Sequence, residues 1–187
     1  MKKLDYVLRN WRYRMVAPHI PGNSDILDIG GYDGSFLTHI RDKIKRGVCI
    51  DPLIEERKDD KIEFVRSRVV DKFPFPDASF DVVTLIAVYE HLHAERESVT
   101  AEIFRVLRDR GYVLLTVPDK AVDHILKLLL SMRLIDGMST FEEHAHFNSR
   151  DTVKIFDGCG FRLVRWKKFQ FGLNSLFIFQ KKTGNEG

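Results

Sequence analysis

The sequence has few cysteines, no apolar run long enough to cross a membrane and no long cluster of basic residues. Its two cysteines, Cys49 and Cys159, lie in neither a Cys-x-x-Cys motif nor a Cys/His cluster, so we expect free thiols in a reducing compartment. The first residues, MKKLDYVLRNWRYRM, lack the apolar core of a signal peptide. Because no stretch reaches the length of a membrane span either, these absences together predict a cytoplasmic protein.

The charges of the chain nearly balance. Thirty Lys and Arg residues against 27 Asp and Glu residues leave a formal net charge of +3, and no Lys/Arg cluster reaches five residues. This composition does not predict a nucleic-acid partner. A chain of 187 residues that is 44% hydrophobic and 30% charged is ordinary for one globular domain with an apolar core. We therefore expect a single domain over residues 1–187.

Apolar runs and helical periods alternate along the chain. Residues 81–88, DVVTLIAV, form a continuous apolar run, typical of a parallel strand that is buried on both faces. Residues 170–175 are too few for a crossover helix, so the strands on either side of them should pair antiparallel. We expect strands at 25–29, 48–50, 62–65, 81–88, 112–117, 161–169 and 176–182, and helices at 4–17, 35–44, 95–107 and 150–157. This order predicts an α/β fold: a Rossmann-like, doubly wound, mostly parallel sheet of seven strands with a C-terminal antiparallel hairpin.

The first predicted strand ends in a carboxylate and a glycine-containing turn, Asp28-Ile29-Gly30-Gly31-Tyr32-Asp33-Gly34. Glycine lets a ligand approach the backbone, because no Cβ stands in the way. A second carboxylate, Asp51, follows the next apolar run about 20 residues later, where it suits the hydroxyls of a ribose. The carboxyl ends of parallel strands share one edge of a sheet, so the two carboxylates should converge there with residues 89–91. The pattern predicts a nucleotide-like cofactor.

Five segments carry a family resemblance. They are ILDIGGYDGSFL, similar to an Asp/Glu-x-Gly-x-Gly-x-Gly motif; VCIDP, similar to a ribose-binding acidic strand end; FPFPDASFDVVTLIAVYEHL; EIFRVLRDRGYVLLTVPD; and HAHFNSRDTVKIFDGCGFRLV. In this order and spacing, over almost the whole chain, they resemble the class I S-adenosylmethionine-dependent methyltransferases of small-molecule type. The resemblance implies S-adenosylmethionine as cofactor, S-adenosylhomocysteine as product, and a sugar-, quinone- or lipid-like acceptor of the methyl group.

The resemblance also implies roles for the residues around the turn. Asp28 would orient the turn and reach the amino group of the cofactor, and Asp51 would accept hydrogen bonds from the ribose hydroxyls; strand-end capping is the alternative for both. Tyr32 stands where the family usually has its middle glycine. The implied cofactor-binding residues are Asp28, Gly30, Gly31, Tyr32 and Gly34 at the methionine end, Asp51, Pro52, Leu53, Arg68 and Val69 around the adenosine, and Ile86, Ala87 and Tyr89 beside the sulfonium.

A general base is needed only for an acceptor such as a hydroxyl or a protonated amine. Glu90, His91 and His146 are the candidates, with His93 and His144 beside them in sequence; a structural hydrogen bond or loop ordering is the alternative for the histidines. Some relatives bind a divalent ion through Glu-x-x-Glu-His, but Ala87 replaces the first glutamate of that pattern here. A carboxylate and an imidazole alone underfill a magnesium or zinc shell, so we predict no metal.

Three parts of the predicted domain lie outside the strand–helix alternation. Residues 1–22 form an N-terminal helix and lead-in, in which Trp11-Arg12-Tyr13-Arg14 either close over the cofactor or dock as an ordinary helix. Residues 119–148 are expected to form a substrate-lid insertion. Its apolar stretch, residues 120–138, would pack on the sheet, line a lipophilic acceptor pocket or form a dimer face. Residues 183–187 form a loose tail. The protein is expected to be a monomer or a homodimer.

Two other functions remain open at this point. Tyr32, and the absence of a carboxylate at positions 67–69 where the family often contacts adenine, are compatible with a catalytically silent Rossmann-like domain that binds the cofactor or a protein partner. A nicotinamide dehydrogenase would need Gly-x-Gly-x-x-Gly, whereas the spacing here is Gly30-Gly31-x-x-Gly34. The dehydrogenase interpretation also does not predict the C-terminal antiparallel hairpin. A small-molecule methyltransferase is therefore the function that the sequence favours.

Overall fold

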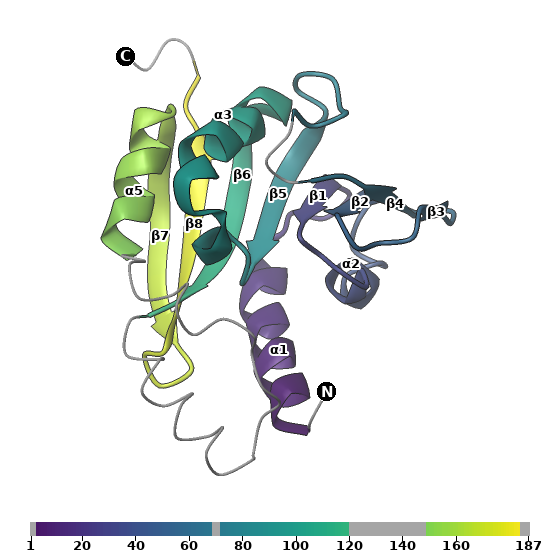
Figure 1. Cartoon of the computed structure of the whole chain (residues 1–187), viewed down its shortest axis with the longest axis horizontal. Helices are drawn as coiled ribbons and strands as arrows, with labels where there is room; N and C mark the ends of the chain where they lie inside the picture. The colour runs from purple at the N-terminus through teal and green to yellow at the C-terminus, as the bar shows by residue number, and fades with distance from the viewer. Residues whose placement is uncertain (1–2, 69–71, 120–148, 184–187) are drawn as a thin grey trace.

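The computed structural model describes residues 3–68, 72–119 and 149–183 (Figure 1). Its strands are β1 (Asp25–Ile29), β2 (Arg46–Asp51), β3 (Arg57–Lys58), β4 (Ile62–Arg66), β5 (Phe80–Ile86), β6 (Leu107–Pro118), β7 (Phe161–Phe169) and β8 (Asn174–Lys181). The α-helices are α1 (Lys3–Val16), α2 (Ser35–His39), α3 (Arg96–Val106) and α5 (Ser149–Gly158), with short 3-10 helices η1 (Ala17–His19) and η2 (Tyr89–Glu95). The predicted lid at 119–148 lies outside the described residues from position 120 onward.

The described strands form one sheet in the order β3-β4-β2-β1-β5-β6-β8-β7. Neighbours from β4 to β6 pair parallel, whereas β8 pairs antiparallel with both β6 and β7. The Rossmann-like class and the C-terminal hairpin are thus confirmed. The sheet has eight strands rather than the seven predicted, because the two-residue β3 pairs antiparallel with β4. Such a short strand has no alternation from which it could be recognised.

Two apolar cores lie on opposite faces of the sheet. Leu27 and Ile29 belong to the core under α3 and α5, whereas Ile26 belongs to the core under α1 and α2 (Figure 1). Successive side chains of a strand point to opposite faces, so Asp28 shares the α1–α2 face with Ile26. This alternation decides on which side of the sheet the glycine turn opens.

Several element boundaries differ from those predicted, among them the ends of α2 and β5 and the start of β6. Helix α2 ends at His39 rather than at residue 44, because Ile40 leaves the helical conformation with φ −108° and ψ 10°. Strand β5 ends at Ile86, and Ala87 follows with a φ of +58°. Strand β6 begins at Leu107 rather than at residue 112, and a register shift between the Phe80–Leu107 pair and the next pair absorbs the additional residues.

Helix α1 is fastened to the hairpin β7–β8. The Gln170 side chain donates a 2.8 Å hydrogen bond to the carbonyl oxygen of Leu8, and Trp11 meets Phe171 edge-to-face with ring centroids 5.7 Å apart. The turn of the hairpin therefore sets the position of α1 over the sheet. Among the described residues, no helix is both long and apolar enough to span a membrane.

The first prediction concerns the core under α5. Phe156 is fully buried and stacks on Phe179 with ring centroids 4.2 Å apart, so Phe156→Ala should lower the free energy of unfolding by about 3–5 kcal/mol. Lys154→Ala on the same helix is the control, because that lysine side chain is 81% exposed. Denaturant titration measures both variants, and equal stabilities would contradict the packing described.

Candidate functional site

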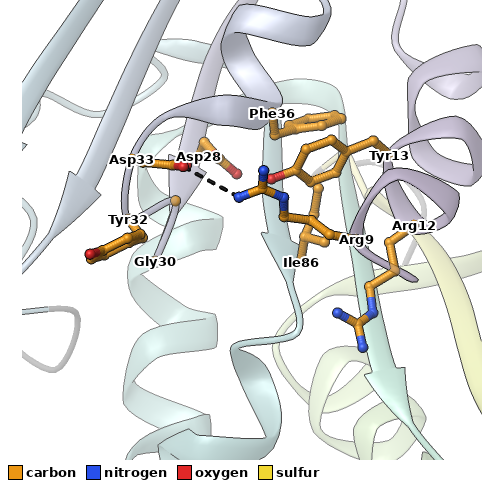
Figure 2. A pocket seen from close by; sticks show the side chains of 10 residues that line it. Arg9, Arg12, Tyr13, Asp28, Gly30, Tyr32, Asp33, Phe36 and Ile86 are labelled. Carbon is orange, nitrogen blue, oxygen red and sulfur yellow. Dashed lines mark hydrogen bonds and ion pairs between the residues drawn. The ribbon is translucent and has the colours of Figure 1, made fainter. Parts of the chain in front are cut away.

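A cavity of about 250 Å³ opens at the carboxyl end of β1, between the glycine turn and α1 (Figure 2). Its position agrees with the general rule for open α/β sheets, in which ligands bind beyond the carboxyl ends of the strands. The residues that line it are Arg9, Arg12, Tyr13, Asp28, Gly30, Gly31, Tyr32, Asp33, Phe36 and Ile86. The turn predicted to cradle a cofactor therefore does border a cavity.

Asp28 is the central acidic group of this cavity. Its side chain is 2% exposed, and its Oδ1 accepts a 2.6 Å hydrogen bond from the hydroxyl of Thr84. Its buried Oδ2 has no hydrogen-bond partner in the part of the chain that the structure describes. Burial raises the pKa of Asp28 to about 7, opposed by the Thr84 hydrogen bond and reinforced by the charges of Asp33 and Asp51. The free oxygen is suited to a hydrogen-bond donor or a cation.

Gly31 is required by the space above Asp28. A Cβ at position 31 would collide with Oδ2 of Asp28 and would lie 2.6 Å from the sulfur of Cys49. Both cysteines are free, as predicted, and Cys49 is buried beneath the turn. At Gly30 the constraint is conformational as well as steric, since its φ is +70° and a Cβ would meet the side chain of Val88. Any side chain at these two positions would displace the turn.

Tyr32 replaces a glycine of the family motif without filling the cavity. Its φ is +46°, a left-handed conformation that is uncommon for a bulky residue. The ring is 63% exposed and points away from Tyr13 and Phe36 (Figure 2). The backbone N–H of Tyr32 donates a 3.2 Å hydrogen bond to Asp51. The substitution therefore leaves the space between the turn and α1 open.

Asp51 ties the glycine turn to the end of β2. Its Oδ2 accepts the bond from Tyr32, and its Oδ1 accepts a 2.8 Å bond from the backbone N–H of Leu53. Each carboxylate oxygen retains a further lone pair with which to accept from a ligand hydroxyl. Pro52 and Leu53 are exposed beside it, Leu53 by 75%. Two other residues predicted to contact the adenosine are Arg68, which is exposed, and Val69, which lies outside the described residues.

The end of β5 reaches the cavity, but Tyr89 in the segment after it does not. Ile86 lines it, and the half-buried Ala87 donates its backbone N–H to the carbonyl oxygen of Thr116. Tyr89 does not line the cavity: its ring is fully buried, and its hydroxyl lies 3.0 Å from that of Thr100. The positive φ of Ala87 turns the chain after β5, and the ring of Tyr89 then packs against Phe156 in the core.

Neither of the two candidate bases within the described residues, Glu90 and His91, lines the cavity. Glu90 is 2% exposed and does not line the cavity, and its Oε2 has no hydrogen-bond partner among residues 3–68, 72–119 and 149–183. Burial raises the pKa of Glu90 to about 7, against the opposing charges of Arg12 and Arg96. His91 is exposed, and His146 lies outside the described residues. Within those residues, no group of three or more His, Cys, Asp or Glu is arranged to hold a metal ion.

Helix α1 contributes more to the cavity than the sequence indicates. Of the four residues expected either to cover the cofactor or to dock as a helix, Arg12 and Tyr13 line the cavity, whereas Trp11 and Arg14 do not. Arg9 also lines it and forms a 3.3 Å ion pair with Asp33 of the turn. Sequence reasoning missed Arg9, although residues three and four positions apart share one face of a helix and this spacing could have identified it.

Comparisons with known proteins agree with this geometry. Residues 2–165 match the family described as methyltransferase domain. A Mycolicibacterium smegmatis protein named "Probable S-adenosylmethionine-dependent methyltransferase" is 30% identical over 163 residues, which cover 79% of this chain. The chain spans only 61% of the length of that relative.

Solved structures show the same fold at lower identity. A chain from the complex of the Haloferax volcanii Trm112 methyltransferase activator superposes with a TM-score of 0.73 at 16% identity, covering 96% of this chain and 92% of that one. An S-adenosylmethionine-dependent methyltransferase from Methanosarcina mazei superposes with a TM-score of 0.65 at 22% identity, covering 90% and 97% respectively. The match over residues 2–165 confirms the resemblance found in the sequence: the chain belongs to the methyltransferase domain family.

Proposed function

We propose that this protein transfers a methyl group from S-adenosylmethionine to a small-molecule acceptor. The observation that carries the proposal is the unpaired buried oxygen of Asp28, a residue that lines a cavity with Gly30 and Gly31 at the carboxyl end of β1. S-adenosylmethionine is the methyl donor that membership of the family implies. A sugar-, quinone- or lipid-like acceptor, and a monomeric or homodimeric protein, remain part of the proposal.

The residues present fit this cofactor. Asp28 would accept a hydrogen bond from its amino group, because Oδ2 has no partner within the described residues. Gly30 and Gly31 allow the turn to keep this course along the cavity, since a Cβ at either position would collide with neighbouring side chains. Asp51 would accept from the ribose hydroxyls, and the exposed side chain of Leu53 would cover one face of the adenine. The roles expected for Gly34, Pro52, Arg68 and Val69 remain proposals on the same basis.

The work of the protein in methyl transfer is mainly orientation. When bound, S-adenosylmethionine would supply an electrophilic methyl group on a positively charged sulfur. The thioether S-adenosylhomocysteine is the leaving group. Holding reactants in line can lower a barrier by about 7–11 kcal/mol. Ile86, Phe36 and Tyr13 form the apolar part of the cavity wall and would exclude water from it. Glu90, His91 and His146 remain the proposed bases for an acceptor that must lose a proton.

A catalytically silent domain that binds the cofactor or a protein partner is the second candidate. It is favoured by one observation: none of the proposed bases within the described residues lines the cavity. Assays of methyl transfer to sugar, quinone and lipid acceptors separate the two candidates. Methylated product supports the enzyme, whereas tight cofactor binding without product from any acceptor supports the silent domain.

Loss of the ribose contact gives the first test of the cofactor. Asp51→Ala should weaken the binding of S-adenosylhomocysteine by about 10- to 100-fold, the usual effect of losing hydrogen bonds to a charged group. Isothermal titration calorimetry measures the change, with NAD as the control ligand. Asp42→Ala is the control variant, because Asp42 is exposed and does not line the cavity. If the unaltered protein does not bind adenosyl compounds, the proposed cofactor is wrong.

The glycine turn offers a matched pair of substitutions. Gly31→Ala should lower stability by about 1–3 kcal/mol and abolish cofactor binding, because the new methyl group collides with Asp28 and Cys49. Gly22→Ala should change neither property, since nothing lies within 4 Å of a Cβ at that position. Thermal unfolding and calorimetric titration compare the two variants. Normal binding by Gly31→Ala would show that the turn does not form the cofactor cradle.

The buried carboxyl of Asp28 predicts a dependence on pH. Its pKa of about 7 in the folded protein lies above the ordinary value of 3.8. Between these two pH values, the folded state therefore keeps a proton on Asp28 that the unfolded state has released. The contribution of Asp28 to stability therefore falls as pH rises from about 4 to 7, by about 4 kcal/mol at most. An asparagine at this position would not ionise, so Asp28→Asn should abolish this loss of stability. The variant should therefore have a higher melting temperature than the unaltered protein at pH 8 but not at pH 4.

The same group should make cofactor affinity depend on pH. Affinity of the unaltered protein should rise from pH 6 to pH 8 as Asp28 loses its proton, whereas Asp28→Asn should bind weakly at both values. Glu90 also has a raised pKa, so the informative quantity is the difference between the variant and the unaltered protein. A parallel pH profile in both proteins would assign the titration to another group.

A further inference from the structure

Strand β7 lies at the edge of the sheet and is exposed along almost its whole length (Figure 1). Only its first and last residues, Phe161 and Phe169, are buried. The exposed residues between them, 162–168, have the sequence RLVRWKK, in which four side chains are cationic, three are large and apolar, and none is acidic. Protein surfaces usually intersperse charges of both signs, so an exposed strand with one sign of charge indicates a partner of the other sign.

The pairing of β7 with β8 separates these cations from the apolar side chains. Residues directly opposite each other in an antiparallel pair share one face of the sheet. Lys167 stands opposite Leu176 of the core under α1 and α2, and Arg165 lies two positions away on the same face. Trp166 stands opposite Phe177 of the other core and stacks on it with ring centroids 5.0 Å apart. The edge therefore has a cationic side and an apolar side.

The cations on the α1–α2 side are not neutralised by neighbouring acids. In the part of the chain that the structure describes, no carboxylate forms an ion pair with Arg165 or Lys167. The half-buried His19 of η1 lies within reach of their charges. Its pKa is lowered by burial and, after that, by the positive charges of Arg165, Lys167 and Lys43. A positive potential thus extends from β7 onto η1 and attracts anions.

The turn after β7 adds an exposed aromatic ring to this edge. Phe171 is 92% exposed, and its φ of +58° is a left-handed conformation that is uncommon for a bulky residue. Because β8 pairs antiparallel with both β6 and β7, β7 runs in the same direction as the parallel strands. Its carboxyl end, and with it Phe171, therefore lies at the edge of the sheet where the cavity opens.

The geometry of β7 distinguishes between possible anionic partners. The register shifts between Leu163 and Arg165, so Val164 forms a bulge, and bulges and lysines on an edge strand hinder pairing with a further strand. A single-stranded nucleic acid would need aromatic rings beside the cations for its bases, but Trp166 lies on the opposite face. The surface of a bilayer needs no register. It offers anionic headgroups to cations and an acyl boundary to exposed apolar side chains.

We propose that residues 162–168 and Phe171, here called the basic edge, form a docking surface for an anionic lipid bilayer. The cations contact the headgroups, while Val164, Trp166 and Phe171 enter the boundary with the acyl chains. Docking needs no cofactor and is therefore independent of the proposed function. Since the cavity opens at the edge of the sheet where Phe171 lies, docking brings this edge to the bilayer and favours a lipid-like acceptor among those proposed above.

Cosedimentation of the full chain with lipid vesicles tests the basic edge. Vesicles of phosphatidylcholine with about 30% phosphatidylglycerol should bind the protein, vesicles of phosphatidylcholine alone should not, and added salt should release it. The double variant Arg165→Gln/Lys167→Gln should weaken binding to the anionic vesicles about 30-fold, since each cation near such a membrane contributes about fivefold. Phe171→Ser should weaken it about 10-fold through the loss of apolar contact.

Lys45→Gln/Lys58→Gln is the matched control, because it removes the same charge from the half of the sheet that is remote from β7. These two side chains are 60% and 68% exposed. The control should bind vesicles as the unaltered protein does, and thermal unfolding checks that each variant is folded.

Three results would overturn the inference. They are the absence of binding to the anionic vesicles, an equal loss in both double variants, which would reflect net charge alone, and binding of polyuridylate in place of vesicles, which would assign the cations to a nucleic acid. Calorimetric titration with S-adenosylhomocysteine keeps the two proposals apart. All variants should bind this ligand as the unaltered protein does, and a failure of the unaltered protein to bind it would contradict only the proposed function.

Discussion

The geometry of the cavity depends on one buried carboxylate, that of Asp28. It stands opposite Thr84 in the parallel pairing of β1 with β5, and the threonine hydroxyl holds one of its oxygens. Burying a carboxylate is costly unless it is paired, and the raised pKa of Asp28 reflects that cost. The second oxygen of Asp28 lies so close to the backbone at position 31 that only glycine fits there. The course of the turn, and with it the floor of the cavity, follows from how this carboxyl group is packed.

The opposite wall comes from a part of the chain that the alternation of strands and helices does not include. Helix α1 is anchored by the turn of the β7–β8 hairpin, through Gln170 and Phe171. The hairpin that ends the sheet therefore also positions the side chains of α1 that line the cavity, Arg9, Arg12 and Tyr13. The cavity of about 250 Å³ is thus lined by acidic residues from the end of β1 and the glycine turn and by basic residues from α1.

Sequence patterns predicted most strands because the alternation and the apolar runs are local properties. Sequence patterns were less accurate for the end of α2. Ile40 and Ile44 are buried, as the helical period requires, yet the backbone leaves the helical conformation at Ile40. The family resemblance implied that Tyr89 lies beside the cofactor. Its direction depends on the left-handed conformation of Ala87, which an alanine does not reveal in a sequence.

The sequence by itself determined the order of strands and helices, the glycine turn, and the acidic residues that end β1 and β2. These features follow from local periodicity and from the rule that parallel strands present their carboxyl ends at one edge. Only the tertiary structure decided that Arg9 and Arg12 line the same cavity as Asp28, that Tyr32 turns its ring away from the cavity, and that Tyr89 enters the core. Such outcomes rest on contacts between distant parts of the chain, such as that of Gln170 with Leu8, and no local pattern specifies which distant side chains will meet.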